Sequence, residues 1–306
     1  MPPEKEKPNT EVFLEQLKKL CPTACGLRSR YVYNKDIADK PPQLSVRTPM
    51  EKVKQFNTDH VCIEDSCKCV NIFLYYHLSY NDVECKEIEK STRGQSLNKN
   101  WHDMRQGLLT ASRFHQICSS RNLLNTATAL LQNSSLNEDH LPAPILFGRR
   151  YEEKARNLFI KGHKFKHRQL KLHVPGLVCR EDMPFLACSP DGIVDCATCG
   201  RFLIEVKCLF KYKCFHPKNA LKLSNICTTD DQGNLSLKSS HMYFDQIQGQ
   251  MALTGVHRCI LVCYTHKGLA TVEVPYDDEF WKSSFDKMSR FYKEVYFPMV
   301  RSLYKN

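Results

Sequence analysis

The stretch Ser189-Pro190-Asp191-Gly192-Ile193-Val194, with Glu205-Val206-Lys207 downstream, decides the fold. Both parts lie in strand-like apolar runs, and segment 196–200 between them has the composition of a turn. The two runs are therefore predicted to pair as a hairpin. Such a hairpin would bring Asp191 alongside Glu205.

The second run, Phe202–Cys208, places its charged residues on one face, because side chains alternate along a strand. Glu205 and Lys207 share that face with Leu203. The alternate apolar residues share the other face, which we expect to pack against helices. A carboxylate and an ammonium are thus expected side by side at the hairpin.

These residues suit a hard divalent cation. Mg²⁺ or Mn²⁺ binds oxygen ligands, which Asp191, Glu205 and the carbonyl of Val206 would supply. A bound metal acidifies water and withdraws charge from a scissile phosphate, and Lys207 would orient the water, help deprotonate it or offset transition-state charge. A bare pattern of this kind is more often an ordinary surface strand. The Ser-Pro before Asp191 and the flanking apolar runs favour function.

Periodicity elsewhere predicts a mixed α/β (α+β) core, with helices first, then a strand cluster, one helix, and a closing hairpin and helix. The predicted helices are 110–119, 121–132, 148–161, 242–254 and 278–304. The predicted strands are 170–174, 185–188, 192–195, 202–208, 259–265 and 270–274. Segment 210–240 is long, basic and polar.

The first hundred residues are weakly patterned, although Thr48-Pro49 resembles a helix start. Segment 91–100 is polar, contains a glycine and has no apolar period, so it is interpreted as a linker. The sequence therefore predicts an accessory region of unknown role at 1–100 and a second domain at 101–306.

The net charge is +11, and residues 101–306 carry 28 Lys and Arg against 19 Asp and Glu. An excess of this size suits a polyanion such as nucleic acid, although solubility alone also explains it. No apolar run approaches the roughly 20 residues of a membrane-spanning helix, and the stretch after Met1 lacks the apolar segment expected of a secretory signal. We expect a soluble intracellular protein without a membrane partner. A nuclear location fits a DNA enzyme, although no strong basic localisation run is present.

Sixteen cysteines without an export signal indicate reduced thiols rather than disulfides. Two groups have zinc-like spacing: Cys62 with Cys67 and Cys69, and the pair Cys196 and Cys199. A structural zinc site needs four ligands, and no second C-x-x-C pair is present. The sequence therefore does not favour structural zinc.

Five ordered motifs resemble the PD-(D/E)xK nuclease superfamily, and more narrowly its phage lambda exonuclease branch, the YqaJ viral recombinase family. The resemblance spans about residues 101–265 and implies a restriction-endonuclease-like core, a central mixed sheet flanked by helices. The motifs are Trp101-x-x-x-Arg105 with Thr110-Ala111-Ser112, Gly148-x-x-Tyr151-Glu152-x-x-Ala155, Ala187-Cys188-Ser189-Pro190-Asp191-Gly192, Glu205-Val206-Lys207, and Tyr243-x-x-Gln246-x-Gln248.

The resemblance also implies roles for further residues. Glu152 would bind the metal or lie just behind its ligands, and Glu181 occupies a place where the family normally has an active-site Asp. Gln246 corresponds to the family's active-site glutamine, which positions water or phosphate. Arg105 and Ser112 match residues that hold a terminal 5′-phosphate, a task suited to a guanidinium and a helix start.

The resemblance predicts a magnesium-dependent deoxyribonuclease that acts on duplex DNA from 5′-phosphorylated ends, in recombination or mobile-element DNA processing. Two alternatives stay open. One is a DNA-end-binding protein of mobile-element origin that has lost catalysis, and the other is a structure-specific endonuclease on the same core. Family members often form a trimer around DNA, which makes a homo-oligomer an expectation from the resemblance alone.

Overall fold

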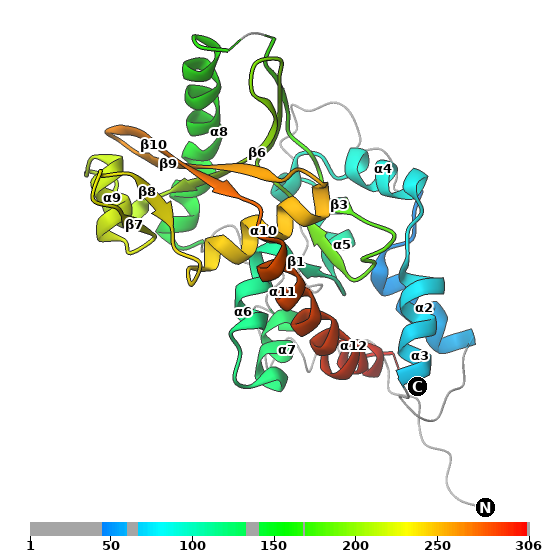
Figure 1. Cartoon of the computed structure of the whole chain (residues 1–306). Coiled ribbons are helices and arrows are strands. Elements are labelled where there is room, and N and C mark those ends of the chain that lie inside the picture. The colour runs from blue at the N-terminus through cyan, green and yellow to red at the C-terminus, as the bar shows by residue number, and fades with distance from the viewer. Residues whose placement is uncertain (1–44, 60–66, 133–140, 168, 305–306) are drawn as a thin grey trace, which may run out of the picture.

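Five strands form one mixed sheet in the computed structural model, which describes residues 45–59, 67–132, 141–167 and 169–304 (Figure 1). Their order is β10-β9-β6-β5-β2; β9 and β6 run parallel, and the other neighbouring pairs run antiparallel. The predicted hairpin is confirmed, since β5 pairs with β6. The strands are β2 (Lys171–His173), β5 (Gly192–Cys196), β6 (Gly200–Cys208), β9 (Arg258–Thr265) and β10 (Gly268–Pro275).

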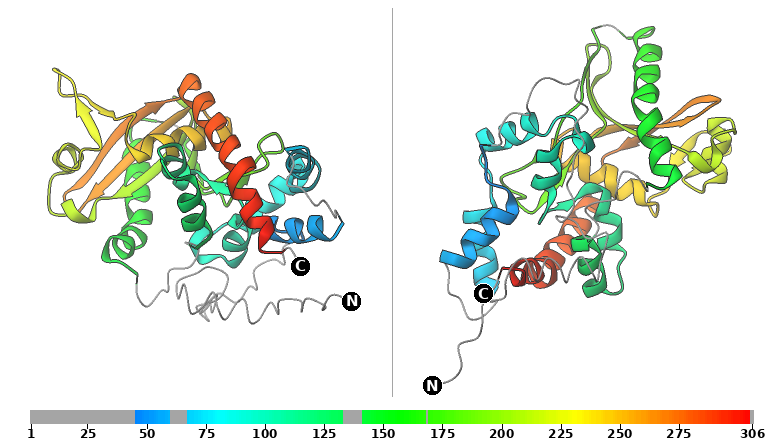
Figure 2. Two further views of the ribbon diagram at one scale, coloured as in Figure 1. Left: turned by 90° about the horizontal axis from the view of Figure 1, so that it is seen from below. Right: turned by 180° about the vertical axis from the view of Figure 1, so that it is seen from behind.

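Helices cover both faces of this sheet. α8 (Ala143–Lys164) packs on one face and α10 (Met242–Thr254) on the other, as Figures 1 and 2 show. β6 is therefore buried on both faces, so its charged face meets α10 rather than solvent. The packed side chains include Ala155, Phe159, Phe202 and Ile204 on the α8 side and Leu203, Ile247 and Met251 on the α10 side.

The end of α10 follows from its sequence. Gly255 adopts a left-handed conformation at φ 67°, which glycine enters without steric cost. The amide of Val256 then donates to the carbonyl of Met251 at 3.2 Å and closes the helix. The predicted bounds 242–254 are those observed.

A second, smaller sheet with the order β1-β4-β3 is surrounded by helices. Its strands are β1 (Leu109–Thr110), β4 (Leu186–Cys188) and β3 (Val178–Cys179). The helices that share its core are α2 (Pro49–Asp59), α3 (Cys67–Ile72), η1 (Phe73–Leu78), α4 (Asp82–Ser91), α5 (Lys99–Arg105), η3 (Ala111–Arg113), α6 (Phe114–Cys118), α7 (Leu123–Gln132), α11 (Asp278–Phe291), η6 (Tyr292–Tyr296) and α12 (Phe297–Ser302). The short helix η2 (Gln95–Leu97) has no buried residue.

The described part of the N-terminal region shares a core with the C-terminal helices. The rings of Phe73 and Phe297 stack with their centroids 4.4 Å apart. The centroid of the Phe56 ring lies 6.3 Å from that of Phe297. The hydroxyl of Tyr292 donates to the carbonyl of Gly107 at 3.0 Å. Shared packing does not define independent folding, so the predicted division at residue 100 stays a prediction.

One prediction of local structure, the helix at 110–119, is wrong in detail. Segment 110–119 is divided among β1, η3 and α6, because Leu109 and Thr110 pair in parallel with β4. Segment 210–240 contains η5 (Phe210–Tyr212), α9 (Pro217–Leu223) and a hairpin of β7 (Cys227–Thr229) and β8 (Leu235–Leu237). The Asp230 carboxylate holds that hairpin's turn by accepting from the amides of Gln232 and Asn234.

Within the described ranges, no helix combines the length and the apolar character needed to cross a bilayer. The fold is a mixed α/β arrangement with a central mixed sheet flanked by helices, as predicted.

Gly249 gives a test of the packing between α10 and its neighbours. A Cβ at this position would lie 2.3 Å from Cε2 of Phe114, a buried ring that cannot move aside easily. We expect Gly249→Ala to lower the free energy of unfolding by about 1–3 kcal/mol in chemical denaturation. Gly162→Ala is the control, because a Cβ there meets nothing within 4 Å and should not destabilise. Equal stability of both variants would contradict the close packing.

Candidate active site

The carboxylate of Asp191 lies where the β5 ladder ends. The β5–β6 register stops at Gly192 and Ile204, and Asp191 Oδ2 accepts from the amide of Val206 at 2.6 Å. The N–H and C=O of one strand residue point to the same side, so the Val206 carbonyl faces the side of Asp191. The structure thus brings these two predicted oxygen ligands together.

Glu205 is 2% exposed, and three donors reach its carboxylate. Oε1 accepts from Gln246 Nε2 at 2.6 Å and from Lys207 Nζ at 2.7 Å, and Oε2 accepts from Gln250 Nε2 at 2.8 Å. Lys207 Nζ also donates to Gln246 Oε1 at 3.2 Å. α10 thereby joins the predicted residues Glu205, Lys207 and Gln246 into one network.

The third predicted carboxylate, Glu152, comes from α8. The Glu152 side chain is 41% exposed and lies 3.5 Å from Arg156 one helical turn later. Arg156 Nη1 in turn donates to the backbone carbonyl of Asp191 at 3.0 Å. This contact fixes the turn before β5 against α8.

The carboxylates at this site repel one another. Burial raises the pKa of Asp191 well above its usual value, and the charges of Glu205 and Glu152 raise it further. Partial burial also raises the pKa of Glu152, and the neighbouring charge of Arg156 opposes that rise. Burial alone would lower the pKa of Lys207, but Glu205 and Asp191 outweigh it and raise that pKa. Lys207 is therefore held as an ammonium among carboxylates.

The donor set fits a hard divalent cation. Three carboxylates and a backbone carbonyl offer the oxygen atoms that Mg²⁺ and Mn²⁺ prefer. The charges of Glu205 and Glu152 add to the effect of burial in raising the pKa of Asp191, and a cation bound there would oppose that rise. Asp191, Glu205, Glu152 and the Val206 carbonyl are thus the residues that would hold such an ion.

Glu181 is not brought into this cluster. Its side chain is exposed, and its backbone carbonyl accepts from Ser79 Oγ at 3.5 Å. The largest electrostatic influences on Asp191 are those of Glu205, Glu152 and Lys207. A role for Glu181 at the metal therefore has no support in the geometry and stays a prediction from the family resemblance.

Arg105 and Ser112 lie on either side of Thr110. Arg105 Nη2 donates to Thr110 Oγ1 at 3.1 Å, and Thr110 Oγ1 lies 3.5 Å from Ser112 Oγ. The Arg105 guanidinium stacks 3.8 Å above the ring of Trp101, whose Nε1 donates to Ser189 Oγ at 2.8 Å. A chain of contacts thus connects this predicted phosphate pocket to the turn that carries Asp191.

Two residues of the site were missed by sequence reasoning. Gln250 lies four residues after Gln246 on α10, and Arg156 lies four residues after Glu152 on α8. The i, i+4 spacing places each on the same helical face as its predicted neighbour. The i, i+4 spacing could have indicated that these residues share a helical face with Gln246 and Glu152. It does not indicate which strand that face covers.

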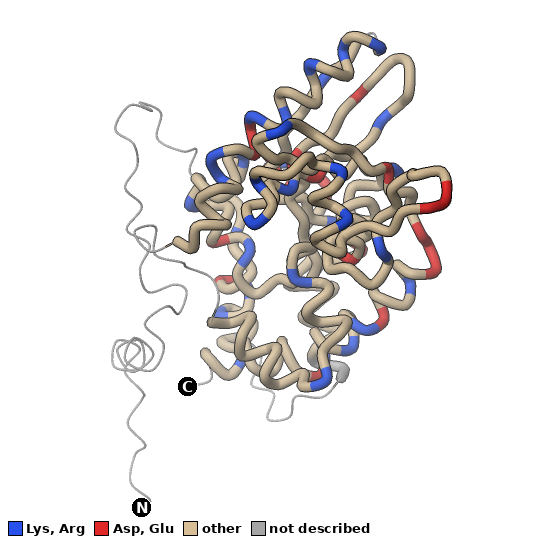
Figure 3. The backbone as a smooth tube through the Cα atoms, turned by 90° about the vertical axis from the view of Figure 1, so that its left-hand side faces the viewer, with Lys and Arg blue, Asp and Glu red and all other residues tan. Residues whose placement is uncertain are grey.

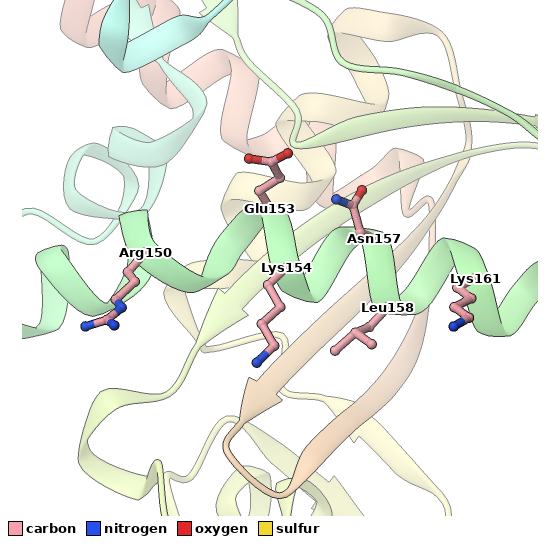
Figure 4. Close-up of a pocket in the computed structure, with 6 residues that line it drawn as sticks. All are labelled: Arg150, Glu153, Lys154, Asn157, Leu158 and Lys161. Carbon is pink, nitrogen blue, oxygen red and sulfur yellow. The ribbon is translucent and has the colours of Figure 1, made fainter. Parts of the chain in front are cut away.

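A shallow pocket of about 450 Å³ lies along exposed residues of α8 (Figure 4). It contains none of the predicted site residues. α8 carries six Lys and Arg against two Glu, and Figure 3 shows how Lys and Arg are spread over the backbone. The pocket is lined by Arg150, Glu153, Lys154, Asn157, Leu158 and Lys161. It is a mainly basic surface of α8 and is not the carboxylate cluster.

Comparison with protein families matches residues 100–257 to the YqaJ-like viral recombinase domain. The chain is also 26% identical over 172 residues to the shutoff alkaline exonuclease of human herpesvirus 8 type P (isolate GK18). That match covers 50% of this chain but only 32% of the viral protein, so the chain spans about a third of its relative's length.

A solved structure shows a similar fold. LHK-Exo, an alkaline exonuclease from Laribacter hongkongensis solved in complex with dAMP, matches with a TM-score of 0.51 and 21% identity over 67% of this chain and 96% of that one. The shutoff and exonuclease protein of Kaposi's sarcoma-associated herpesvirus matches with a TM-score of 0.49 and 14% identity, over 86% of this chain and 88% of that one. At these identities the likeness to LHK-Exo concerns the fold alone.

The raised pKa of Asp191 predicts a cost to stability. A carboxyl whose pKa is higher in the folded state holds its proton more tightly there, so stability falls as pH rises above the usual value of 3.8. Asn keeps an oxygen for the Val206 amide but carries no charge. We therefore expect Asp191→Asn to raise the Tm of the metal-free protein at pH 7 by about 2–4 °C.

The gain should shrink as the pH is lowered towards 4, which thermal unfolding across a pH series measures. Asp195→Asn is the matched control, because Asp195 is on β5 but its side chain is 57% exposed. A lower Tm for Asp191→Asn than for the parent protein would contradict the electrostatic account.

Proposed function

Because the chain belongs to the YqaJ-like viral recombinase domain family, we propose that it is a metal-dependent deoxyribonuclease that degrades duplex DNA 5′ to 3′ from 5′-phosphorylated ends. The observation that carries the proposal is the network that joins Glu205, Lys207 and Gln246, next to Asp191, which the Val206 amide holds at the end of the same hairpin. The name of the viral relative, an alkaline exonuclease, supports the same activity.

Asp191, Glu205, Glu152 and the Val206 carbonyl would hold Mg²⁺, with Mn²⁺ as the alternative ion. The bound cation would acidify a water and withdraw charge from the scissile phosphate. The protein's own contribution is to keep the carboxylates apart and oriented: the Val206 amide orients Asp191, and two glutamine amides orient Glu205.

Lys207 acts as a donor rather than as a base in this proposal. Its pKa is raised by Glu205 and Asp191, so it stays protonated at neutral pH. An ammonium can orient the attacking water and offset charge that develops on the phosphate oxygens. Gln246 positions that ammonium, because its Oε1 accepts from Lys207 while its Nε2 holds Glu205.

Arg105 and Ser112 would receive the terminal 5′-phosphate. A guanidinium fork binds phosphate oxygens in pairs, and the Trp101 ring holds this guanidinium flat. Hydrolysis that breaks the P–O3′ bond leaves a new 5′-phosphate on the remaining strand. The product of one cycle would thus be the substrate of the next, which favours processive digestion.

Duplex DNA is the proposed partner. A homo-oligomer, with a trimer as the family's usual form, and a nuclear location are further proposals that follow from the resemblance.

Substitution of Asp191 tests catalysis directly. We expect Asp191→Asn to lower the rate of digestion of linear 5′-phosphorylated duplex in Mg²⁺ by at least about 10²–10³-fold, because a bound metal loses a charged ligand. DNA binding in the absence of cleavage should persist. Asp195→Asn is the matched control and should digest at the parent rate.

The substrates separate the alternatives. Closed circular DNA should stay intact, and cutting of circles would favour a structure-specific endonuclease. Binding of ends without digestion in either Mg²⁺ or Mn²⁺ would favour an inactive end-binding protein. Undiminished digestion by Asp191→Asn would refute the catalytic assignment.

Arg105 gives an independent test of end recognition. We expect Arg105→Ala to abolish the preference for a 5′-phosphate over a 5′-hydroxyl end, measured as a ratio of initial digestion rates. Arg105→Lys keeps the charge but loses the paired hydrogen bonds, so part of the preference should remain. An unchanged ratio in Arg105→Ala would place the phosphate pocket elsewhere.

A further inference from the structure

Four potential zinc ligands converge where α8 ends beside the β5–β6 turn. His163 and His167 lie one helical turn apart, and the amide of His167 still donates to the carbonyl of His163 at 3.1 Å. Cys196 and Cys199 come from the opposite segment, at the end of β5 and in the turn that follows. One side-chain ligand atom from each residue lies within 4.8 Å of all the others.

We propose that these four residues form a structural Zn²⁺ site. The spacing H-x₃-H with C-x₂-C is that of Cys₂His₂ zinc centres. The two half-sites occur in reverse order, helix before turn, compared with the usual zinc finger. The site lies outside the carboxylate cluster and does not depend on the proposed nuclease activity.

The distances agree with tetrahedral coordination. With Zn–S of about 2.3 Å and Zn–N of about 2.0 Å, a sulfur and a nitrogen ligand lie about 3.5 Å apart. Cys199 Sγ and His163 Nε2 are 3.6 Å apart. This pair therefore already has the separation that a shared zinc ion would impose.

The imidazoles have little other reason to be arranged in this way. Their rings are parallel within 1°, with centroids 3.8 Å apart. The Nδ1 atom of His167 is buried and has no hydrogen-bond partner among the described residues. A buried polar atom without a partner costs free energy, which a metal–nitrogen bond would recover.

The surroundings support a structural role. The ring of Phe159 stacks on His163 at 5.3 Å, and Phe202 meets the same imidazole edge-on at 5.4 Å. Arg258 Nη1 donates to the Cys199 carbonyl at 3.1 Å, and its guanidinium is paired with Glu273. Cys196 is buried and the other three ligands are partly buried, so the cluster joins the end of α8 to the hairpin turn. Four protein ligands would fill the tetrahedral positions of a structural zinc site.

This site revises the expectation from the sequence, which did not favour zinc. The sequence offers no second C-x-x-C pair as a partner for Cys196 and Cys199, whereas the structure places two histidines from α8 beside them. The other candidate group is not described: Cys62 lies outside the described residues, and nothing is described of the side chains of Cys67 and Cys69.

Zinc content of the full chain tests the proposal. We expect about one zinc per chain by elemental analysis after desalting, and loss of that zinc in His163→Ala and in Cys199→Ser. The matched controls are His216→Ala and Cys214→Ser, because both residues are exposed. Asp191→Asn should keep its zinc, which separates this site from the nuclease proposal.

A second measurement covers variants that fail to fold. Co²⁺ added to the zinc-depleted parent protein should give the visible absorption bands of tetrahedral thiolate coordination, and Zn²⁺ should displace them. Removal of zinc with 1,10-phenanthroline should lower the Tm, and added Zn²⁺ but not Mg²⁺ should restore it.

Three outcomes would overturn the proposal. One is a chain purified with far less than one zinc that shows no shift in Tm with Zn²⁺. Another is a Cys196–Cys199 disulfide in place of metal under reducing conditions. The third is zinc that survives in Cys199→Ser but is lost when Cys62, Cys67 and Cys69 are replaced together by Ser.

Discussion

The hydrogen bond from the Val206 amide to the Asp191 carboxylate is the contact on which the site depends. The backbone pairing of β5 with β6 ends at Gly192 and Ile204. The next amide of β6 that faces β5, that of Val206, therefore donates to the Asp191 carboxylate instead of to a backbone carbonyl. The absence of a side chain at Gly192 leaves room for Leu172 on the neighbouring strand, since a Cβ there would lie 2.8 Å from Cδ1 of Leu172. The Asp191 side chain thus ends the hydrogen-bonded pairing of β5 with β6 and places a carboxylate at the end of the strand.

Burying negative charge at the end of β5 lowers the stability of the fold, and neighbouring side chains compensate for only part of this cost. Gln246 and Gln250 satisfy both oxygens of Glu205, and Lys207 supplies one positive charge. Asp191 is left with a raised pKa beside two other carboxylates. A buried arrangement of this kind costs stability unless a cation joins it, which is the usual trade between stability and activity at a functional site.

The hairpin and α10 could be predicted from the sequence because strand alternation and helical periodicity are local properties. Segment 110–119 could not, because the pairing of β1 with β4 overrides its helical pattern. Gln250 and Arg156 were missed for a related reason: their partners lie on other elements. The predicted residues Asp191, Glu205 and Lys207 do converge, whereas Glu181 does not, since only three-dimensional packing decides which acidic residues share a site.

α8 carries residues of both candidate metal centres, Glu152 at one and His163 at the other. The distance between them makes the position of Glu152 sensitive to the tilt of the helix. Glu152 and His163 are eleven residues apart, a separation of about 16 Å along a helix. A tilt of about 4° about the His163 end would move Glu152 by about 1 Å, a displacement that can reduce catalysis by about 10²-fold. Arg156 restrains the helix near Asp191, and the Cys–His cluster restrains its far end against the same hairpin. Contacts at both places on α8 therefore fix the angle between the helix and the hairpin, which a contact at one place alone would not fix.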